Sequence, residues 1–310
     1  MIAPILTLPS MLRHIPILSA LLVCTIAAPG ESQNRPAGQP IGMVLQVQGQ
    51  TEIRHAGSAA TSARIADFHF AGDRVATGFG RATLLSCPLP ETITLKEDTE
   101  VELGGEEAKT LRGQIISRVR VEICPVLRTA LGSETLERVG GLRGRPGYSP
   151  IAVYLGGPVS TGRPTFEWAA VAAAKTFHLL LRKPDGTVLW DYRASSNRVS
   201  FPDTKPPLAE GSYEWELQAE ADDKIVAAQT ANFEIKLRGS APQTNDAAPS
   251  LLRAVVLEQA GYYAEAAAEF RTLEKDNPSD SRIVRHLAWL YNNAGLIAAA
   301  NDQMQKVNRQ

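Results

Sequence analysis

Ala71-Gly-Asp-Arg-Val-Ala-Thr-Gly-Phe-Gly-Arg-Ala-Thr-Leu-Leu85 is the stretch of sequence that decides the fold of the N-terminal half. Its Gly72-Asp73 pair is typical of a turn, and Gly78–Gly80 predicts a second turn between two short strands. Several further segments alternate apolar and polar residues as strands do: 43–49, 51–54, 92–95, 99–103 and 118–123. Short strands with turn signals at this spacing predict a compact all-β sandwich or roll.

Two segments resemble the FecR-like family of bacterial envelope domains: Gly42-Met-Val-Leu-Gln-Val-Gln-Gly49 and the run Ala71–Leu85. The Gly-Asp-x-x-x-Thr-Gly part of the second segment is the most specific. The likeness covers about residues 40–105, and it implies a FecR-like β domain over 41–131. It also implies one candidate function, a sensory or ligand-binding role in the cell envelope.

A second β region is expected over residues 150–238, where aromatic residues alternate with polar ones. The signature Pro164-x-Phe-x-Trp168 together with Leu208-x-x-Gly-x-Tyr-x-Trp215 resembles a fibronectin type III or immunoglobulin-like sandwich. The simplest interpretation of Trp168 and Trp215 is that both lie in the core. The alternative is that one of them stacks on a sugar.

The C-terminal segment repeats itself at a spacing of 34 residues, and the matched pairs are Ala254/Ala288, Leu257/Tyr291, Gly261/Gly295, Ala266/Ala300 and Phe270/Met304. This order and spacing resemble two tetratricopeptide repeats over 249–310. Four helices are expected, at 249–260, 263–276, 280–293 and 296–308. The fold class predicted for the whole chain is therefore multidomain and mainly β, with a C-terminal all-α helical-repeat module.

The resemblance to tetratricopeptide repeats implies a groove that binds other proteins. One face of the third expected helix carries side chains suited to a peptide carboxylate or backbone and to an aromatic anchor: Arg282, Arg285, Trp289, Asn292 and Asn293. The equivalent positions of the first repeat are Leu251, Val255, Glu258 and Gln259. The alternative is that Trp289 packs on Val255 within the stack and that the arginines are merely solvated.

Composition excludes several classes of protein. With 44% hydrophobic residues, 21% charged residues and a net charge of -1, the 310-residue chain is neither disordered nor drawn to nucleic acid. The segment from Lys109 to Arg145 is locally basic, with eight basic and three acidic residues. This pattern indicates either a solvated surface or contact with an acidic envelope polymer.

The sequence lacks the motifs that mark serine hydrolases, phosphate loops and zinc metalloproteases. Asp67 and His69 share a strand face at a spacing that allows metal binding, but they equally suit a strand edge and turn. The histidines at 55, 178 and 286 have no evident partner in the sequence. We therefore expect a protein that is not an enzyme and that has no cofactor and no metal.

Residues 1–28 are typical of a secretory signal peptide, because Arg13 and His14 precede the short apolar run Ile15–Ile26 and small residues follow it. A lipoprotein anchor at Cys24 is disfavoured because Val23 is not small. No transmembrane span is expected. Segments 29–40, 132–149 and 239–248 are expected to be linkers.

Cys87 and Cys124 remain after the expected cleavage, and an even count in an exported chain predicts a disulfide between them. The interpretation that follows is a non-catalytic envelope protein, periplasmic or extracellular. It would act as a scaffold that binds another envelope protein or a second copy of itself. The alternatives are a FecR-like sensory, ligand-binding or polymer-binding protein and, third, an enzyme of unrecognised type.

Overall fold

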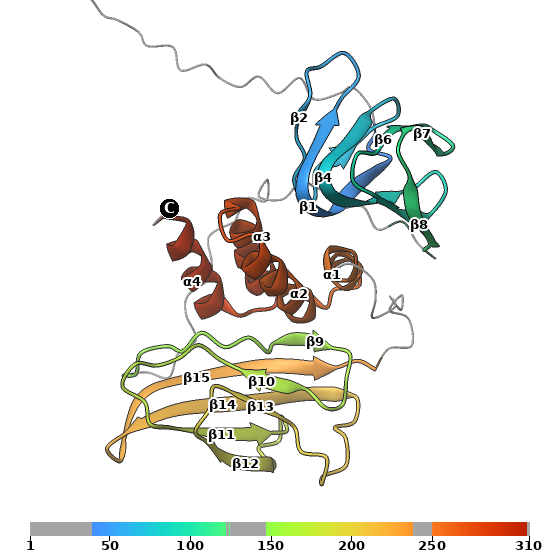
Figure 1. The fold of residues 1–310 in the computed structure, drawn as a ribbon. Coiled ribbons are helices and arrows are strands. Elements are labelled where there is room, and N and C mark those ends of the chain that lie inside the picture. The colour runs from blue at the N-terminus through green and yellow to red at the C-terminus, as the bar shows by residue number, and fades with distance from the viewer. Residues whose placement is uncertain (1–38, 122–123, 125–146, 238–249, 309–310) are drawn as a thin grey trace, which may run out of the picture. The chain divides into compact units, whose positions relative to one another are not determined.

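The computed structural model describes residues 39–121, 124, 147–237 and 250–308 (Figure 1). The fold is mainly β with four C-terminal helices, in agreement with the coarse prediction. The expected signal peptide and most residues of the three expected linkers lie outside the described residues. Among the residues that the structure describes, no helix is long and apolar enough to span a membrane.

The N-terminal half forms an eight-stranded sheet in which consecutive pairs are antiparallel. Strand β1 pairs with β2, β3 and β4, strand β4 also pairs with β5 and β6, and β8 and β7 continue from β5 and β6. The strands are β1 (Gly42–Arg54), β2 (Thr61–Ser62), β3 (Phe68–His69), β4 (Arg74–Ser86), β5 (Glu91–Leu95), β6 (Glu100–Leu103), β7 (Ala108–Arg112) and β8 (Ile115–Arg120).

Strand β1 begins with an apolar run because both of its faces are covered there. Val44 belongs to the core inside the sheet, together with Leu84 and Ile93. Met43 and Leu45, which point to the opposite face, belong to a larger hydrophobic cluster that the sheet shares with the rest of the described chain. Side chains alternate between the two faces of a strand, so a strand buried on both sides reads as a continuous apolar run.

The second turn predicted at Gly78–Gly80 is wrong. Strand β4 continues through these residues, and the β1–β4 register shifts between Gly49 and Thr51. Gly80 has a φ of +144°, and a Cβ atom there would lie 1.8 Å from the carbonyl oxygen of Gln48. The glycines therefore serve a bulge within a long strand pair rather than a reversal of the chain.

Cys87 and Cys124 form the predicted disulfide, with their Cα atoms 5.3 Å apart. Both half-buried cysteines pack against the large hydrophobic cluster. The bond ties the end of β4 to the residues that follow β8.

The middle of the chain forms a five-stranded sheet with the order β12-β11-β14-β15-β9, together with the pair β10-β13. The tryptophans predicted to be in the core are buried: Trp168 is 0% and Trp215 1% exposed. Phe166 of β10 lies against Trp215 and Phe233, so the two sheets share an aromatic core. The strands are β9 (Gly157–Val159), β10 (Thr165–Glu167), β11 (Thr176–Arg182), β12 (Val188–Ala194), β13 (Arg198–Ser200), β14 (Gly211–Ala221) and β15 (Lys224–Ile235).

Four helices follow, close to the predicted positions: α1 (Ser250–Gln259), α2 (Tyr263–Asp276), α3 (Ser281–Asn293) and α4 (Ile297–Val307). Gly261 and Gly295, the matched glycines of the repeat, both have positive φ, +83° and +75°, where a residue with a Cβ atom is strained. The buried residues of α4 are Ala299, Ala300 and Gln303, and the polar Gln303 is only 2% exposed.

The helices share a hydrophobic cluster with both β regions. Helix α2 contacts β9, and α1 contacts β1. Polar bonds also join the helices to the middle sheets: the hydroxyl and N–H of Ser160 donate to Glu265, at 2.8 and 2.7 Å, and Arg271 donates to Glu167 at 2.9 Å. The helical segment is therefore packed into the rest of the described chain.

Candidate protein-binding surface

The residues predicted to bind a partner lie along one side of α3, and we call Arg282, Arg285, Trp289, Asn292 and Asn293 the α3 polar face. The face starts at the helix cap. Asp280 accepts a hydrogen bond from the backbone N–H of Arg282 at 3.0 Å. Its carboxylate also accepts from the guanidinium of Arg282, with distances of 3.0 Å to Nε and 2.7 Å to NH2. An acidic cap satisfies a free N–H of the first turn.

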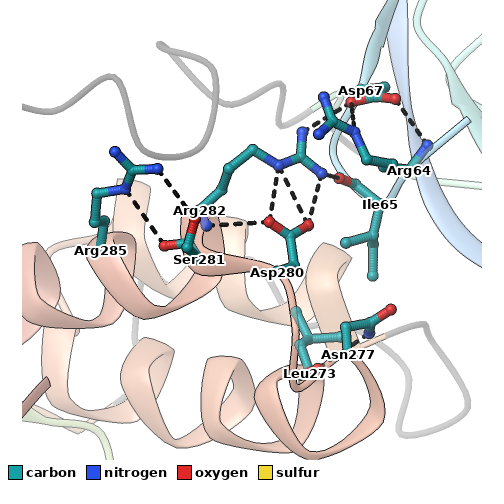
Figure 2. A network of polar contacts seen from close by, with 9 residues as sticks. All are labelled: Arg64, Ile65, Asp67, Leu273, Asn277, Asp280, Ser281, Arg282 and Arg285. Atoms are coloured by element: carbon teal, nitrogen blue, oxygen red, sulfur yellow. Dashed lines mark hydrogen bonds and ion pairs between the residues drawn. The ribbon is translucent and has the colours of Figure 1, made fainter. Parts of the chain in front are cut away.

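Arg282 uses its remaining donors on a segment far away in the chain (Figure 2). Its NH1 donates to Asp67 Oδ1 at 2.8 Å, and its NH2 donates to the carbonyl of Ile65 at 3.0 Å. Asp67 also accepts from the backbone N–H of Arg64 at 2.7 Å, which fixes the carboxylate in a tight turn. The guanidinium thus holds both a carboxylate and a backbone carbonyl of one segment outside the helices.

Burial and charge oppose each other in this network. Burial by itself would raise the pKa of Asp280, but the hydrogen bonds and charge of Arg282 outweigh it and lower the pKa of that carboxyl. Burial would likewise lower the pKa of Arg282, but Asp280 and Asp67 raise it. Both groups are therefore held in their charged forms.

The rest of the α3 polar face is partly free. Arg285 is exposed, and among the described residues it bonds Ser281 at the start of its own helix, with 3.1 Å to Oγ. Asn293 is exposed and donates to the carbonyl of Trp289 at 2.8 Å, and Asn292 is half-buried. Trp289 is half-buried, stacked on His286 with ring centres 5.4 Å apart and edge-on to Tyr263 at 5.8 Å.

The equivalent residues of α1 divide into two groups. Leu251 and Val255 are 0% exposed, so they cannot form the predicted apolar patch of an open groove. They belong to the large hydrophobic cluster that the helices share with both β regions, and α1 packs against α2 and contacts β1. Gln259 is exposed, whereas Glu258 accepts a hydrogen bond from His286 Nε2 at 2.8 Å.

Sequence reasoning was wrong about the isolated histidines, because all three have carboxylate partners. His286 is only 1% exposed and pairs with Glu258. His55 Nδ1 lies 2.7 Å from Asp73, and His178 Nε2 lies 2.8 Å from Asp191. Each partner is distant in the sequence, and no local motif marks such a pair.

Asp67 and His69, the candidate metal ligands, have separate partners. His69 Nε2 bonds the carbonyl of Leu85 at 2.8 Å, and burial lowers the pKa of this histidine to about 4 despite that bond. Asp67 instead binds Arg64 and Arg282. In the described part of the chain no group of three His, Cys, Asp or Glu side chains is placed to hold a metal ion.

A cavity of about 480 Å³ lies between β15 and the turn that joins α3 to α4. Its lining combines small apolar residues with polar ones, among them Gln229, Thr230, Asn232 and Asn293. The cavity adjoins the end of the α3 polar face through Asn293. It is large enough for a small polar ligand.

Comparison with known proteins identifies no family. No family model matches the chain, and no curated protein matches it. Among solved structures, this chain is similar to a cell surface anchoring domain. The two share 23% identity over 22% of this chain and 91% of the other, and the TM-score is 0.21.

Two further structures cover more of the chain. The extracellular domain of a proposed one-component system from B. thetaiotaomicron shares 11% identity over 64% of this chain and 29% of the other, with a TM-score of 0.22. The FN1–FN3 domains of chicken CNTN1 share 12% identity over 64% and 68%, also with a TM-score of 0.22. The structural neighbours are thus extracellular, cell-surface and fibronectin-type domains.

Proposed function

We propose that this protein is a non-catalytic, exported scaffold of the bacterial cell envelope, and that its α3 polar face binds an extended, carboxylate-bearing segment of another protein. The observation that supports the proposal is that the guanidinium of Arg282 donates hydrogen bonds to the carboxylate of Asp67 and to the carbonyl of Ile65. This is the chemistry by which an arginine recognises a peptide, applied here to a segment of the same chain.

The other residues of the α3 polar face could contact the same bound segment further along the helix. Arg285 and Asn293 are exposed, and Trp289 offers a half-buried aromatic surface next to them. Tryptophan and arginine are the residues that most often dominate the energy of a protein interface. A partner segment would therefore run from Arg285 past Trp289 toward Asn293.

The resemblance to tetratricopeptide repeats supports the same surface. Matched positions of the two helix pairs have matched structural roles: Ala254 and Ala288 are both 0% exposed, as are Ala266 and Ala300. In that family, the face of the first helix of each pair lines the binding groove. In this chain the apolar part of the corresponding face on α1 is buried within the chain itself, so binding would concentrate on α3.

A second candidate function, ligand sensing, is favoured by the cavity between β15 and the α3–α4 turn. Its polar lining suits a small ligand, and Asn293 belongs both to the cavity and to the α3 polar face. A ligand there would change the partner surface directly. This candidate is tested by thermal-shift screening of small polar compounds against the wild type, with the Asn232→Leu variant as the comparison.

The scaffold proposal is tested by placing a photo-reactive amino acid at position 285 in the native host and identifying the cross-linked partner. The Arg285→Ala, Trp289→Ala double variant, carrying the cross-linker at position 293 instead, should lose that partner. Asp67→Ala, which frees Arg282, should increase its capture. Thr272→Ala, an exposed change on α2, is the matched control. An unchanged cross-linked product in the folded double variant would refute the site, and a product made only of this chain would identify a second copy as the partner.

A further inference from the structure

Strand β8 forms an edge of the eight-stranded sheet. Of the strands that the structure describes, β8 pairs with β5 alone. The register places Arg120 opposite Glu91 and Arg118 opposite Ile93, and the N–H of Val121 donates to the carbonyl of Pro90 at 2.8 Å. Backbone groups alternate between the two edges of an antiparallel strand, so Arg118 and Arg120 direct theirs away from β5. No described strand pairs with this side of β8, so an added strand could bond these groups.

The side chains of this edge are unusually apolar for an exposed position. Ile116 is 41% and Val119 50% exposed on β8, and Leu111 is 40% exposed on the adjoining β7. Because side chains alternate along a strand, Arg118 and Arg120 share one face, and Ser117 and Val119 share the other, whereas Ile116 lies where the β5–β8 register shifts. A strand added to β8 would meet cations on one face and an apolar residue on the other.

The charge of the edge selects the ligand. Residues 108–121 contain four basic residues and no acidic one. Arg112 pairs with Asp98, and Arg118 pairs with Glu91 and also donates to the carbonyl of Ala108 at 3.0 Å. Lys109 and Arg120 have no ion pair with any described residue. The edge therefore attracts anionic partners, and the two faces of the strand attract different side chains.

We infer that the β8 edge binds an extended acidic peptide segment of a partner protein, which adds to the sheet as a further strand. A carboxylate of the peptide would face Arg120, and β-branched apolar residues at the neighbouring positions would pack beside Val119. An acidic polysaccharide would meet the cations but would not use the outward N–H and C=O groups. This site is separate from the α3 polar face and does not depend on it.

The test uses the full chain and a short labelled peptide that alternates Glu and Val. Fluorescence anisotropy should show binding, and hydrogen exchange should slow at the amides of 116–120. A peptide of the same composition with its Glu and Val residues in separate blocks, and one that alternates Lys and Val, should bind about tenfold more weakly or worse. Equal binding of the block peptide or of polyglutamate, without slower exchange on β8, would overturn the inference and leave a nonspecific polyanion surface.

Two variants of one residue separate the backbone from the charge. Arg120→Pro removes an outward N–H without removing a bond to β5, and it should weaken peptide binding about tenfold. Arg120→Glu keeps the N–H and should shift the binding preference toward the Lys-Val peptide. This second variant decides the question if the proline variant does not fold. Wild-type binding by both folded variants would contradict the inference. The Arg285→Ala, Trp289→Ala double variant should bind the peptide normally, so the failure of one site is distinguishable from the failure of the other.

Discussion

Arg282 in α3 and Asp67 in the loop before β3 form an ion pair between residues 215 positions apart, with NH1 2.8 Å from Oδ1. Their side chains are 16% and 19% exposed. A pair that is largely shielded from water differs from a surface pair, because removing one partner leaves the other desolvated and unmatched. This contact joins the loop before β3 to the helices through charge.

Arg282→Ala should lower the free energy of unfolding by about 1–3 kcal/mol, because Asp67 and Asp280 lose a shared charged donor. Arg282→Lys should recover only part of the loss, since an ammonium cannot reproduce the planar fork that spans two carboxylates and a carbonyl. Urea unfolding followed by tryptophan fluorescence measures the effect. Arg285→Ala is the control, and it should change stability by no more than about 0.5 kcal/mol because Arg285 is exposed. Equal effects of the two alanine variants would contradict this account.

Stability should fall between pH 6.5 and about 4 because of His69. Burial lowers the pKa of this histidine from 6.5 to about 4, so the unfolded chain takes up a proton in this range while the folded chain does not. The stabilisation is complete above the unfolded pKa and decreases as the pH falls toward the folded one, by roughly 3 kcal/mol at most. His69→Gln, which keeps a donor for the Leu85 carbonyl, should flatten the curve of unfolding free energy against pH over this range. An unchanged slope in the variant would assign the pH dependence to other groups.

Reduction of the disulfide should cost about 3–4 kcal/mol, because the bond closes a loop of 37 residues in the unfolded chain. The Cys87→Ala, Cys124→Ala double variant should show the same loss without any reductant. If the reduced wild type and the double variant lose the same free energy of unfolding, the alanine substitutions themselves have not damaged the packing. If peptide mapping under non-reducing conditions finds both cysteines free in the folded protein, the bond itself is wrong.

The sequence predicted what depends on local periodicity and missed what depends on distant contacts. The helix positions followed from the apolar period and the matched glycines Gly261 and Gly295. The partner of His286, by contrast, lies 28 residues away on another helix. The turn at Gly78–Gly80 was misjudged because a glycine that permits a bulge looks the same in sequence as one that permits a reversal. Of the predicted binding residues, Leu251 and Val255 are unavailable because they lie in the hydrophobic cluster that the helices share with both β regions, and no pattern within the helices indicates this burial.

The helices and the middle sheets should unfold together and not as separate units. Glu265 stands in the first turn of α2 and accepts from both the N–H and the hydroxyl of Ser160 beside β9. Gly156 contributes to the same junction, because a Cβ atom there would lie 2.6 Å from Leu296. These contacts and the shared hydrophobic cluster predict a single cooperative unit rather than a helical module on a tether.

Glu265→Ala should therefore lower the opening free energy of amides in β15 and in α3 by the same amount, about 1–3 kcal/mol, because both are exposed by the same unfolding event. Glu265→Gln, which keeps an acceptor for Ser160, should show a smaller loss, and Thr272→Ala on the exposed side of α2 should show almost none. Native-state hydrogen exchange resolved by residue measures all three. If the amides of α1–α4 lose protection from exchange while those of β15 keep theirs, the helices open independently. The contacts with β9 would then add little to stability.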